Sequence, residues 1–472
     1  MVKNLTIQLS MNIKVIRIPW RLIVFYLVFL SIAFSGKAQQ RLSLKDLPNL
    51  VQSNLPQLNA SKATVAADRS LIDYEKRSLM PDLTVGYQAN IATFNNITGM
   101  NYPGLMMPIS GPPSQNNALN FVPGTAVAAL LTWRPISFGQ RSSAIERATA
   151  QFKLANADYN EQTFRYQFTA INTYLDAVFL KQLISNHQAS IKRYSSNLEQ
   201  SLVLAKTGLR PGVDTIQLQS SIAQAEIELL QSENSYKQKL IALCALIGSE
   251  QRDGNLILVD TVFKKINISA DMSMTTANHP YFLTAVAQKD LTAAKLDEVK
   301  KIWRPKLDFW GNVYSRGSGI NAMGTINKSE GFNLSRDNIG AGVQISFPVF
   351  QFYQLNARKK EYGELLKADE FKLKQSELDL NKQNDIAWQQ YKSNVAILGK
   401  IDIRLKSATD AFNSLKLSYE SGLIDFSRLA QAQYELQQAE VNSAGALLVV
   451  QRSLLEISIA KGDLDLFFQQ IQ

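Results

Sequence analysis

Four stretches of the chain alternate between apolar and other residues, one position at a time. The alternation is clearest at 338–347 and recurs near 82–91, 125–134 and 306–315. In the clearest stretch the apolar positions are Ile339, Ala341, Val343, Ile345 and Phe347, and the positions between them are Gly340, Gly342, Gln344 and Ser346. Strict alternation predicts β-strands with one apolar face, and about ten residues is the length that a tilted strand needs to cross hydrocarbon. We therefore expect four membrane-spanning strands, with Val343 and Ile345 facing lipid and Val343 near the midplane.

The segments around these strands favour a membrane barrel over the alternative, a soluble hairpin with one wet face. Residues 92–120 and 316–337 are long and rich in Gly, Pro, Asn and Ser, and outer-membrane barrels place long loops outside the cell. Prolines mark the borders with the helices, because proline lacks a backbone N–H and disfavours helix before it. The border prolines are Pro81 and Pro305 before ascending strands, and Pro135 and Pro348 at the ends of descending strands. Trp133 and Trp303 lie beside these borders, where an aromatic girdle is expected.

Two long stretches without proline predict exceptionally long helices at 138–206 and 352–420. Each has about 69 residues, or roughly 100 Å at 1.5 Å per residue. The shorter helices predicted at 43–79 and 213–247 would match one long helix if they were stacked end to end. Residues 429–457 carry apolar and small residues in steps of three and four, which predicts a closely packed coiled-coil seam.

The chain contains an internal repeat. The matched pairs are Pro56/Pro280, Pro81/Pro305 and Leu83/Leu307, 224 residues apart, and Gly208/Gly422, 214 residues apart. Each repeat is predicted to run helix, strand, long loop, strand, very long helix, turn and helix, the last of these being 213–247 in repeat 1 and 425–462 in repeat 2. The predicted organisation is a signal peptide at 1–38, repeat 1 at 39–248, an equatorial inter-repeat segment at 249–275 and repeat 2 at 276–472.

The N-terminus has the features of a secretory signal peptide. Residues 1–38 carry five basic residues and no acidic one, with an apolar run at 22–34 and a small-x-small cleavage site at 36–38. The run is shorter than the roughly 20 residues of a membrane-spanning helix. A buried N-terminal helix is the alternative, and either Met1 or Met11 can be the start. No later stretch of about 18 residues is uniformly apolar, so no membrane helix is expected after the signal.

Composition excludes several function classes. Removing the basic signal lowers the net charge from +10 to about +5, too weak and dispersed for a nucleic-acid partner. Cys244, the only cysteine, excludes a disulfide framework. We expect His187 and His279 to be solvent-facing or capping residues and not metal ligands. No nucleophile–base pattern or cofactor fingerprint is present, so we expect neither an enzyme nor a cofactor.

Four strands per chain cannot close a membrane barrel, which needs at least eight. Two chains would give eight strands with a filled interior, so a trimer with twelve strands is the smallest assembly with a lumen. The order of elements, the duplicated unit and the Gly-Leu turns resemble the TolC-like outer membrane efflux protein family. The resemblance covers nearly all of the chain after the signal.

The resemblance implies a mixed α/β membrane protein of the Gram-negative outer membrane. Its transmembrane β-barrel would be shared between the protomers of a homotrimer, with four strands per chain, and would continue into a long periplasmic α-helical coiled-coil barrel. The function implied is the passive exit duct of a tripartite efflux or type I secretion system. The partners implied are outer-membrane lipid, a periplasmic adaptor, an inner-membrane pump and the exported substrate. The alternative is a periplasmic coiled-coil adaptor or scaffold without a barrel.

The resemblance also points to a periplasmic entrance at the turns of Gly208 and Gly422. The family's pattern has an Asp six residues after the turn glycine. Asp214 fits this pattern in repeat 1, whereas Arg428 occupies the position in repeat 2. The residues expected at the entrance are Asp214, Asp425, Arg428 and Gln431. Because Arg428 and Gln431 stand where related channels carry an acidic ring, an entirely acidic entrance is not expected here.

Overall fold

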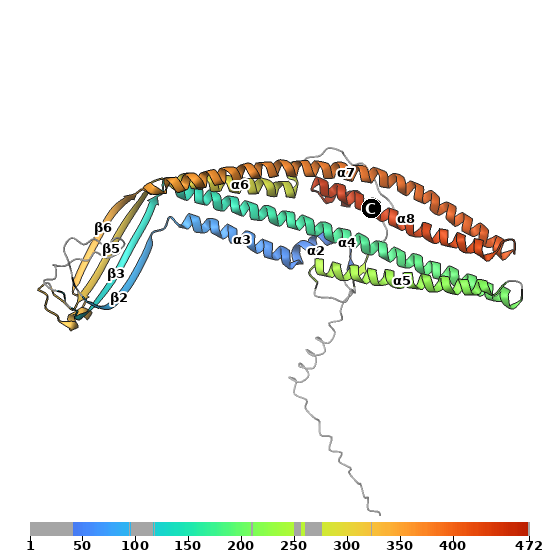
Figure 1. The fold of residues 1–472 in the computed structure, drawn as a ribbon, viewed down its shortest axis with the longest axis horizontal. Coiled ribbons are helices and arrows are strands. Elements are labelled where there is room, and N and C mark those ends of the chain that lie inside the picture. Colours follow the sequence, from blue (N-terminus) through green and yellow to red (C-terminus); the bar gives the residue numbers. More distant parts are fainter. Residues whose placement is uncertain are drawn as a thin grey trace, which may run out of the picture.

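The chain forms a long, bent rod with a four-stranded sheet at one end and two helical hairpins at the other (Figure 1). The computed structural model describes residues 41–93, 95, 117, 119–208, 211–249, 256–259, 276–321 and 323–470. The predicted signal peptide at 1–38 and most of the inter-repeat segment at 249–275 lie outside these residues.

The elements follow the order predicted for two repeats. The helices are α2 (Leu47–Asn54), α3 (Pro56–Arg77), α4 (Gln140–Lys206), α5 (Val213–Leu246), α6 (Pro280–Lys301), α7 (Phe352–Glu420), α8 (Phe426–Lys461) and α9 (Asp465–Gln470). The strands are β1 (Arg41–Leu42), β2 (Asp82–Thr93), β3 (Phe121–Ile136), β4 (Ile257–Leu258), β5 (Lys306–Ser318) and β6 (Arg336–Ser346). Three short 3-10 helices are η1 (Thr276–Asn278), η2 (Lys328–Phe332) and η3 (Val349–Gln351).

The two very long helices are confirmed, since α4 has 67 residues and α7 has 69. The single helix predicted at 43–79 is wrong, because Leu55 adopts an extended conformation and separates α2 from α3. Pro56 explains the break, since proline disfavours a helical conformation in the residue before it and is well placed in the first turn of a helix. His279 has the same extended conformation before Pro280 in the second repeat. The two repeats therefore share the same backbone conformation at this position.

Within each repeat the two shorter helices meet end to end, as α5 with α3 and α8 with α6 (Figure 1). Glycines with positive φ lie at both joints, Gly248 after α5 and Gly462 after α8. A Cβ atom on Gly248 would lie 2.4 Å from the carbonyl oxygen of Asn54, and one on Gly462 would lie 2.9 Å from Cδ2 of His279. Only glycine permits both the backbone conformation and the close approach.

The main hydrophobic core lies around these joints, in the middle of the rod. It joins α2, the middle of α4, the end of α5, α7 and the end of α8. The short parallel pair β1–β4 adds to it, and Tyr174 of α4 donates a hydrogen bond to the carbonyl of Leu42. This pairing places Ile257 and Leu258 of the inter-repeat segment in the middle of the rod.

The predicted seam of α8 is a packed interface. Its buried members are Leu429, Ala432, Leu436, Ala439, Val450, Ser453 and Ile457. Among the described residues, α8 is the one helix long and apolar enough to cross a membrane by length and composition, whereas the sequence predicts none. Half of its most apolar window is buried in the protein, and α8 packs on α7 and α4. Its composition is therefore that of a core helix.

The sheet has the strand order β2-β3-β5-β6, and every pair in it is antiparallel. The contact between β3 and β5 joins the two repeats, so the sheet is continuous across the duplication. Its two outer strands, β2 and β6, have no further strand partner within the described residues. The predicted loop at 316–337 is partly regular, because β5 extends to Ser318, η2 lies within it and β6 begins at Arg336.

Candidate functional site

The strand register brings the apolar positions of all four strands onto one face of the sheet. Residues directly opposite each other in an antiparallel pair lie on the same face. One row across the sheet runs Val85, Ala129, Val313 and Ile339, and the next row towards the helices runs Leu83, Leu131, Gly311 and Ala341. The side chain of Ile339 is 85% exposed. This apolar face is thus continuous and uncovered over most of its area.

The opposite face carries the polar positions and several small residues. The indole of Trp310 in β5 lies over Gly340 and Gly342 of the neighbouring strand β6. A Cβ on Gly342 would be 2.7 Å from Cζ2 of the indole, and a Cβ on Gly340 would be 3.4 Å from Cζ3. Nearby, Arg134 and Asp308 form an ion pair on the exposed surface. The two glycines of β6 therefore make room for a tryptophan that lies against the sheet.

A proline lies at each of the four borders between a long strand and a helix. Pro81 and Pro305 directly precede β2 and β5, and Pro348 lies two residues after the end of β6. Pro135 is the next-to-last residue of β3, which ends at Ile136. The β3–β5 register shifts between Trp133 and Ile136, and such an irregularity accommodates a proline that cannot donate to the ladder.

Both border tryptophans are exposed on the protomer. The indole Nε1–H of Trp133 donates to the carbonyl of Leu79, 2.9 Å away. Its ring lies 6.0 Å from that of Phe309 in the neighbouring strand. Trp133 is thus held at the helix end of the apolar face by one hydrogen bond and one aromatic contact.

At the other end of the rod, the turns of Gly208 and Gly422 are the tips of the hairpins α4–α5 and α7–α8 (Figure 1). Both glycines have positive φ and face open space. The carboxylate of Asp425 caps α8 by accepting a hydrogen bond of 3.1 Å from the backbone N–H of Arg428. The side chain of Arg428 is exposed.

The four predicted entrance residues differ in exposure. Asp214 is only 8% exposed, in the first turn of α5. Asp425, Arg428 and Gln431 are exposed at the start of α8, where Gln431 donates a hydrogen bond to Glu435 one turn further on. The structure therefore places three of them at the surface of one tip and turns the fourth inward at the other.

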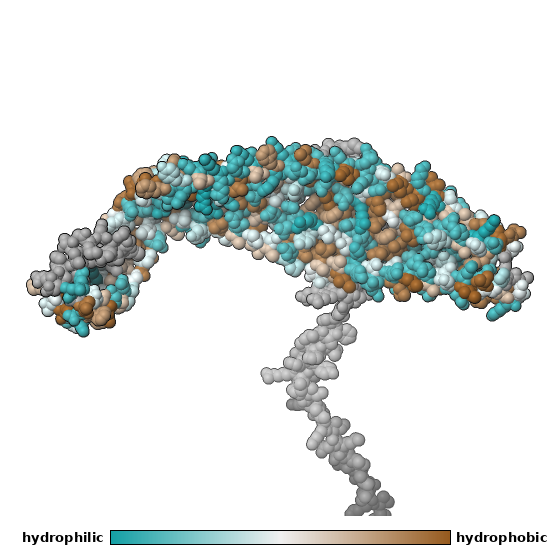
Figure 2. Space-filling view, viewed as in Figure 1, coloured by the Kyte–Doolittle hydropathy of each residue, from teal (hydrophilic) through white to brown (hydrophobic). Residues whose placement is uncertain are grey.

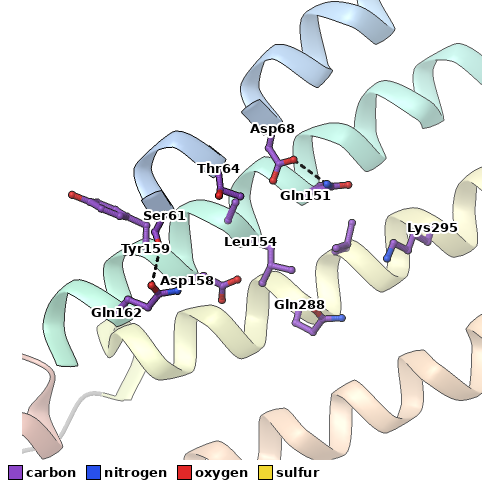
Figure 3. A pocket seen from close by; sticks show the side chains of 12 residues that line it. Ser61, Thr64, Asp68, Gln151, Leu154, Asp158, Tyr159, Gln162, Gln288 and Lys295 are labelled. Atoms are coloured by element: carbon purple, nitrogen blue, oxygen red, sulfur yellow. Dashed lines mark hydrogen bonds between the residues drawn. The ribbon is translucent and has the colours of Figure 1, made fainter. Parts of the chain in front are cut away.

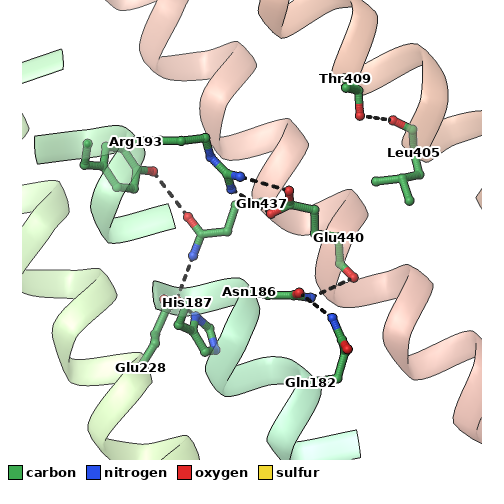
Figure 4. A network of polar contacts seen from close by, with 10 residues as sticks. Gln182, Asn186, His187, Arg193, Glu228, Leu405, Thr409, Gln437 and Glu440 are labelled. Atoms are coloured by element: carbon green, nitrogen blue, oxygen red, sulfur yellow. Dashed lines mark hydrogen bonds and ion pairs between the residues drawn. The ribbon is translucent and has the colours of Figure 1, made fainter. Parts of the chain in front are cut away.

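A network of polar side chains joins the two hairpins above their tips (Figure 4). Arg193 of α4 forms a bidentate ion pair with Glu440 of α8, at 2.6 and 3.0 Å. Gln437 of α8 accepts a hydrogen bond from Tyr194 and donates one to Glu228 of α5. The sequence pattern did not reveal this network.

The two histidines have different roles. The prediction that His187 is solvent-facing or capping is wrong, because it is 6% exposed in the middle of α4 and its Nδ1 lies 3.4 Å from the carboxylate of Glu228. His279 is a capping residue, as predicted. Its Nδ1 accepts from the N–H of Tyr281, and its Nε2 is 2.9 Å from the carbonyl of Ile459. Burial lowers the pKa of His279, and both contacts are those of a neutral ring.

A polar groove of about 510 Å³ lies between α3, α4 and α6 (Figure 3). Hydrogen bonds from Gln151 to Asp68 and from Ser61 to Gln162 cross it. Burial, and secondly the carboxylate of Glu161, raise the pKa of Asp158, which lines the groove. No group of three or more potential metal ligands occurs within the described ranges. The groove is therefore a gap between three helices, lined mainly by polar side chains.

The chain matches the model of the outer membrane efflux protein family over residues 47–249 and 272–462. The two matched ranges correspond to the two repeats and leave out most of the join between them. The chain belongs to this family. Its members are outer-membrane efflux proteins, so the match confirms the predicted efflux function and outer-membrane location. No curated protein matches the chain.

Solved channels share the fold at low sequence identity. The outer-membrane channel OprN matches with a TM-score of 0.72 and 16% identity over 89% of each chain. VceC of Vibrio cholerae matches with a TM-score of 0.71 and 14% identity, over 89% of this chain and 96% of its own. The open state of the MtrE channel of Neisseria gonorrhoeae matches with a TM-score of 0.70 and 14% identity over 89% of each chain. These likenesses extend over both the sheet and the helices.

Proposed function

We propose that three copies of the protein form one exit duct, with a twelve-stranded barrel in the outer membrane and a helical tunnel in the periplasm. The observation that carries the proposal is the four-stranded sheet with two open edges and one continuous apolar face. Hydrocarbon cannot satisfy the unpaired backbone groups of an open edge, so β2 and β6 need partner strands in a membrane. Pairing β6 with β2 of the next copy satisfies both edges, and twelve strands leave a lumen.

The helices support the same assembly. Large apolar side chains remain exposed along α7 and α5, on opposite margins of the protomer. They include Leu365, Phe371, Leu378, Ile386 and Ile403 of α7, and Ile216, Ile227, Leu230 and Ile241 of α5. Such rows on a long helix are typical of interfaces with another helix. A ring of three copies would bring the two margins together.

The hairpin tips would form the periplasmic entrance. Asp425, Arg428 and Gln431 would line it, with Asp214 set back from the surface. The Arg193–Glu440 ion pair would restrain the hairpin α7–α8 against α4. An adaptor and an inner-membrane pump would supply the substrate, which belongs either to an efflux or to a type I secretion route.

The competing function is a periplasmic adaptor or scaffold without a barrel. A periplasmic adaptor would also contain long helices, but a soluble adaptor would not need a sheet with an uncovered apolar face. Light scattering of the detergent-solubilised protein separates the two, because a shared barrel requires three times the protomer mass. A stable monomer would exclude the proposed duct, and a trimer that forms no conducting channel in planar bilayers would leave the scaffold as the better account.

A further inference from the structure

The segment that connects β5 to β6 folds back over the apolar face of the sheet. Thr125 points to this face, and its hydroxyl donates a hydrogen bond of 2.8 Å to the carbonyl of Gly331 in η2. Gly317 also points to this face, and a Cβ there would lie 2.1 Å from the carbonyl oxygen of Asn333. Thr125 is therefore only 6% exposed on a face that is otherwise open. Two independent contacts thus place the turn at 319–334 on the apolar side.

Close backbone contacts fasten this turn to the sheet. The N–H of Gly319 donates to the carbonyl of Pro123, 2.9 Å away, and the N–H of Asn327 closes the turn on the carbonyl of Gly319. A Cβ on Gly331 would lie 2.4 Å from the carbonyl oxygen of Pro123. Any larger residue at Gly331 would push the turn off the strand. The turn is therefore a built part of the sheet's free end.

The outer surface of the turn is apolar at several positions. Met323 is 92% exposed and Phe332 is 64% exposed, and Ile326 and Leu334 are exposed beside them. Figure 2 shows hydrophobic residues at this free end of the sheet. Folding against the sheet explains the glycines of the turn but leaves these large side chains unpacked, so a further apolar surface is needed to cover them.

The distance of the turn from the helix end of the sheet indicates which apolar surface covers these side chains. The row of Thr125 lies eight residues along β3 from Trp133 at the helix end. At about 3.4 Å per residue and a tilt of roughly 40°, this places the turn about 20 Å from the Trp133 border. The apolar band of an outer-membrane barrel is about 25 Å tall. The turn thus reaches the opposite boundary of the band, where hydrocarbon meets headgroups.

We propose that the turn at 319–334 is a lipid-contacting collar, which lies on the outside of the barrel and places Met323 and Phe332 in the interface of the outer leaflet. The inference rests on the proposed barrel with its apolar face outward. In the trimer three such turns would surround the barrel mouth. Each would anchor the strand ends of β3 and β5 against the membrane surface, in place of a loop that projects into solvent.

Spin-label accessibility in reconstituted vesicles tests the collar. Single cysteines at Phe332, Ile339 and Asn338 are placed in a Cys244→Ala background, which removes the only native thiol. Each label is compared for access to oxygen, which concentrates in lipid, and to a water-soluble nickel chelate. The collar predicts that Phe332→Cys resembles Ile339→Cys on the apolar face. Asn338→Cys, on the polar face, should favour the nickel chelate.

The outcomes separate the collar from the duct itself. If Ile339→Cys is lipid-accessible while Phe332→Cys reports water, the collar is wrong and the barrel stands. If Ile339→Cys itself reports water, the proposed barrel fails. Gly331→Val gives a second readout, because it should release the turn and move the Phe332→Cys label into water without changing the Ile339→Cys label. A Phe332→Cys label that stays in lipid in the Gly331→Val variant would contradict the fastening on which the collar depends.

Discussion

Replacing Ile339 with arginine tests the membrane face at its most sensitive point. The register places Ile339 in the row of Val85 and Ala129, midway between the row of Trp133 at one border and the row of Thr125 at the other. Arginine at the midplane of a barrel costs about 2–4 kcal/mol, falling to about 0–1 kcal/mol near the interfaces. Three copies therefore lose roughly 6–12 kcal/mol, which is comparable with the entire stability of a typical domain.

Two matched variants control for the charge and for the depth. Asn338→Arg places the same side chain one residue away on the polar face, where a wet lumen can solvate it, so we expect a normal yield of trimer. Val343→Arg stays on the apolar face but lies across from Phe309, in the row of Trp133. This register moves Val343 from the predicted midplane towards the border, so its defect should be smaller than that of Ile339→Arg.

The assay is the fraction of trimer in outer-membrane extracts, measured for each variant at equal expression. We expect Ile339→Arg to assemble far less than Val343→Arg, and Asn338→Arg to match the unmodified protein. Equal yields for Ile339→Arg and Asn338→Arg would mean that the sheet is not in a membrane. A greater defect for Asn338→Arg would mean that the apolar face is the inner one.

Three further changes test the joint and the entrance. Gly462→Ala should lower the thermal stability of the trimer more than Gly422→Ala. Both substitutions incur about 1–2 kcal/mol of left-handed strain, but only the new Cβ at position 462 also collides with another residue, His279. Equal losses of stability would contradict the packed joint. Since burial lowers the pKa of His279, the unfolded chain binds more protons, so stability should fall as pH drops through its ordinary value of 6.5. His279→Asn retains a capping side chain and should weaken this dependence of stability on pH, measured by thermal unfolding. An unchanged dependence on pH would mean that another group titrates. Arg428→Asp should raise cation selectivity, measured as reversal potentials in planar bilayers, and an unaltered potential would remove Arg428 from the entrance.

Local patterns were sufficient to predict most elements of this protein. Strand alternation is a property of neighbouring residues, so the four strands and the position of Val343 and Ile345 on the apolar face of the sheet could be predicted from the chain. The absence of proline over 138–206 and 352–420 likewise predicted α4 and α7, because the length of a helix depends on interruptions within it. Pro56 was the exception. Its effect on Leu55 is equally local, and the break before α3 could have been predicted from it.

The tertiary structure decided how these pieces meet. The register that aligns Val85 with Ile339 depends on pairing between strands far apart in the chain, which the alternation within each strand does not specify. The burial of His187 and the ion pair of Arg193 with Glu440 likewise depend on the docking of α4 against α5 and α8. Contacts at such separations are set by packing, and a polar residue in a helix carries no local sign of whether it will face water or a partner.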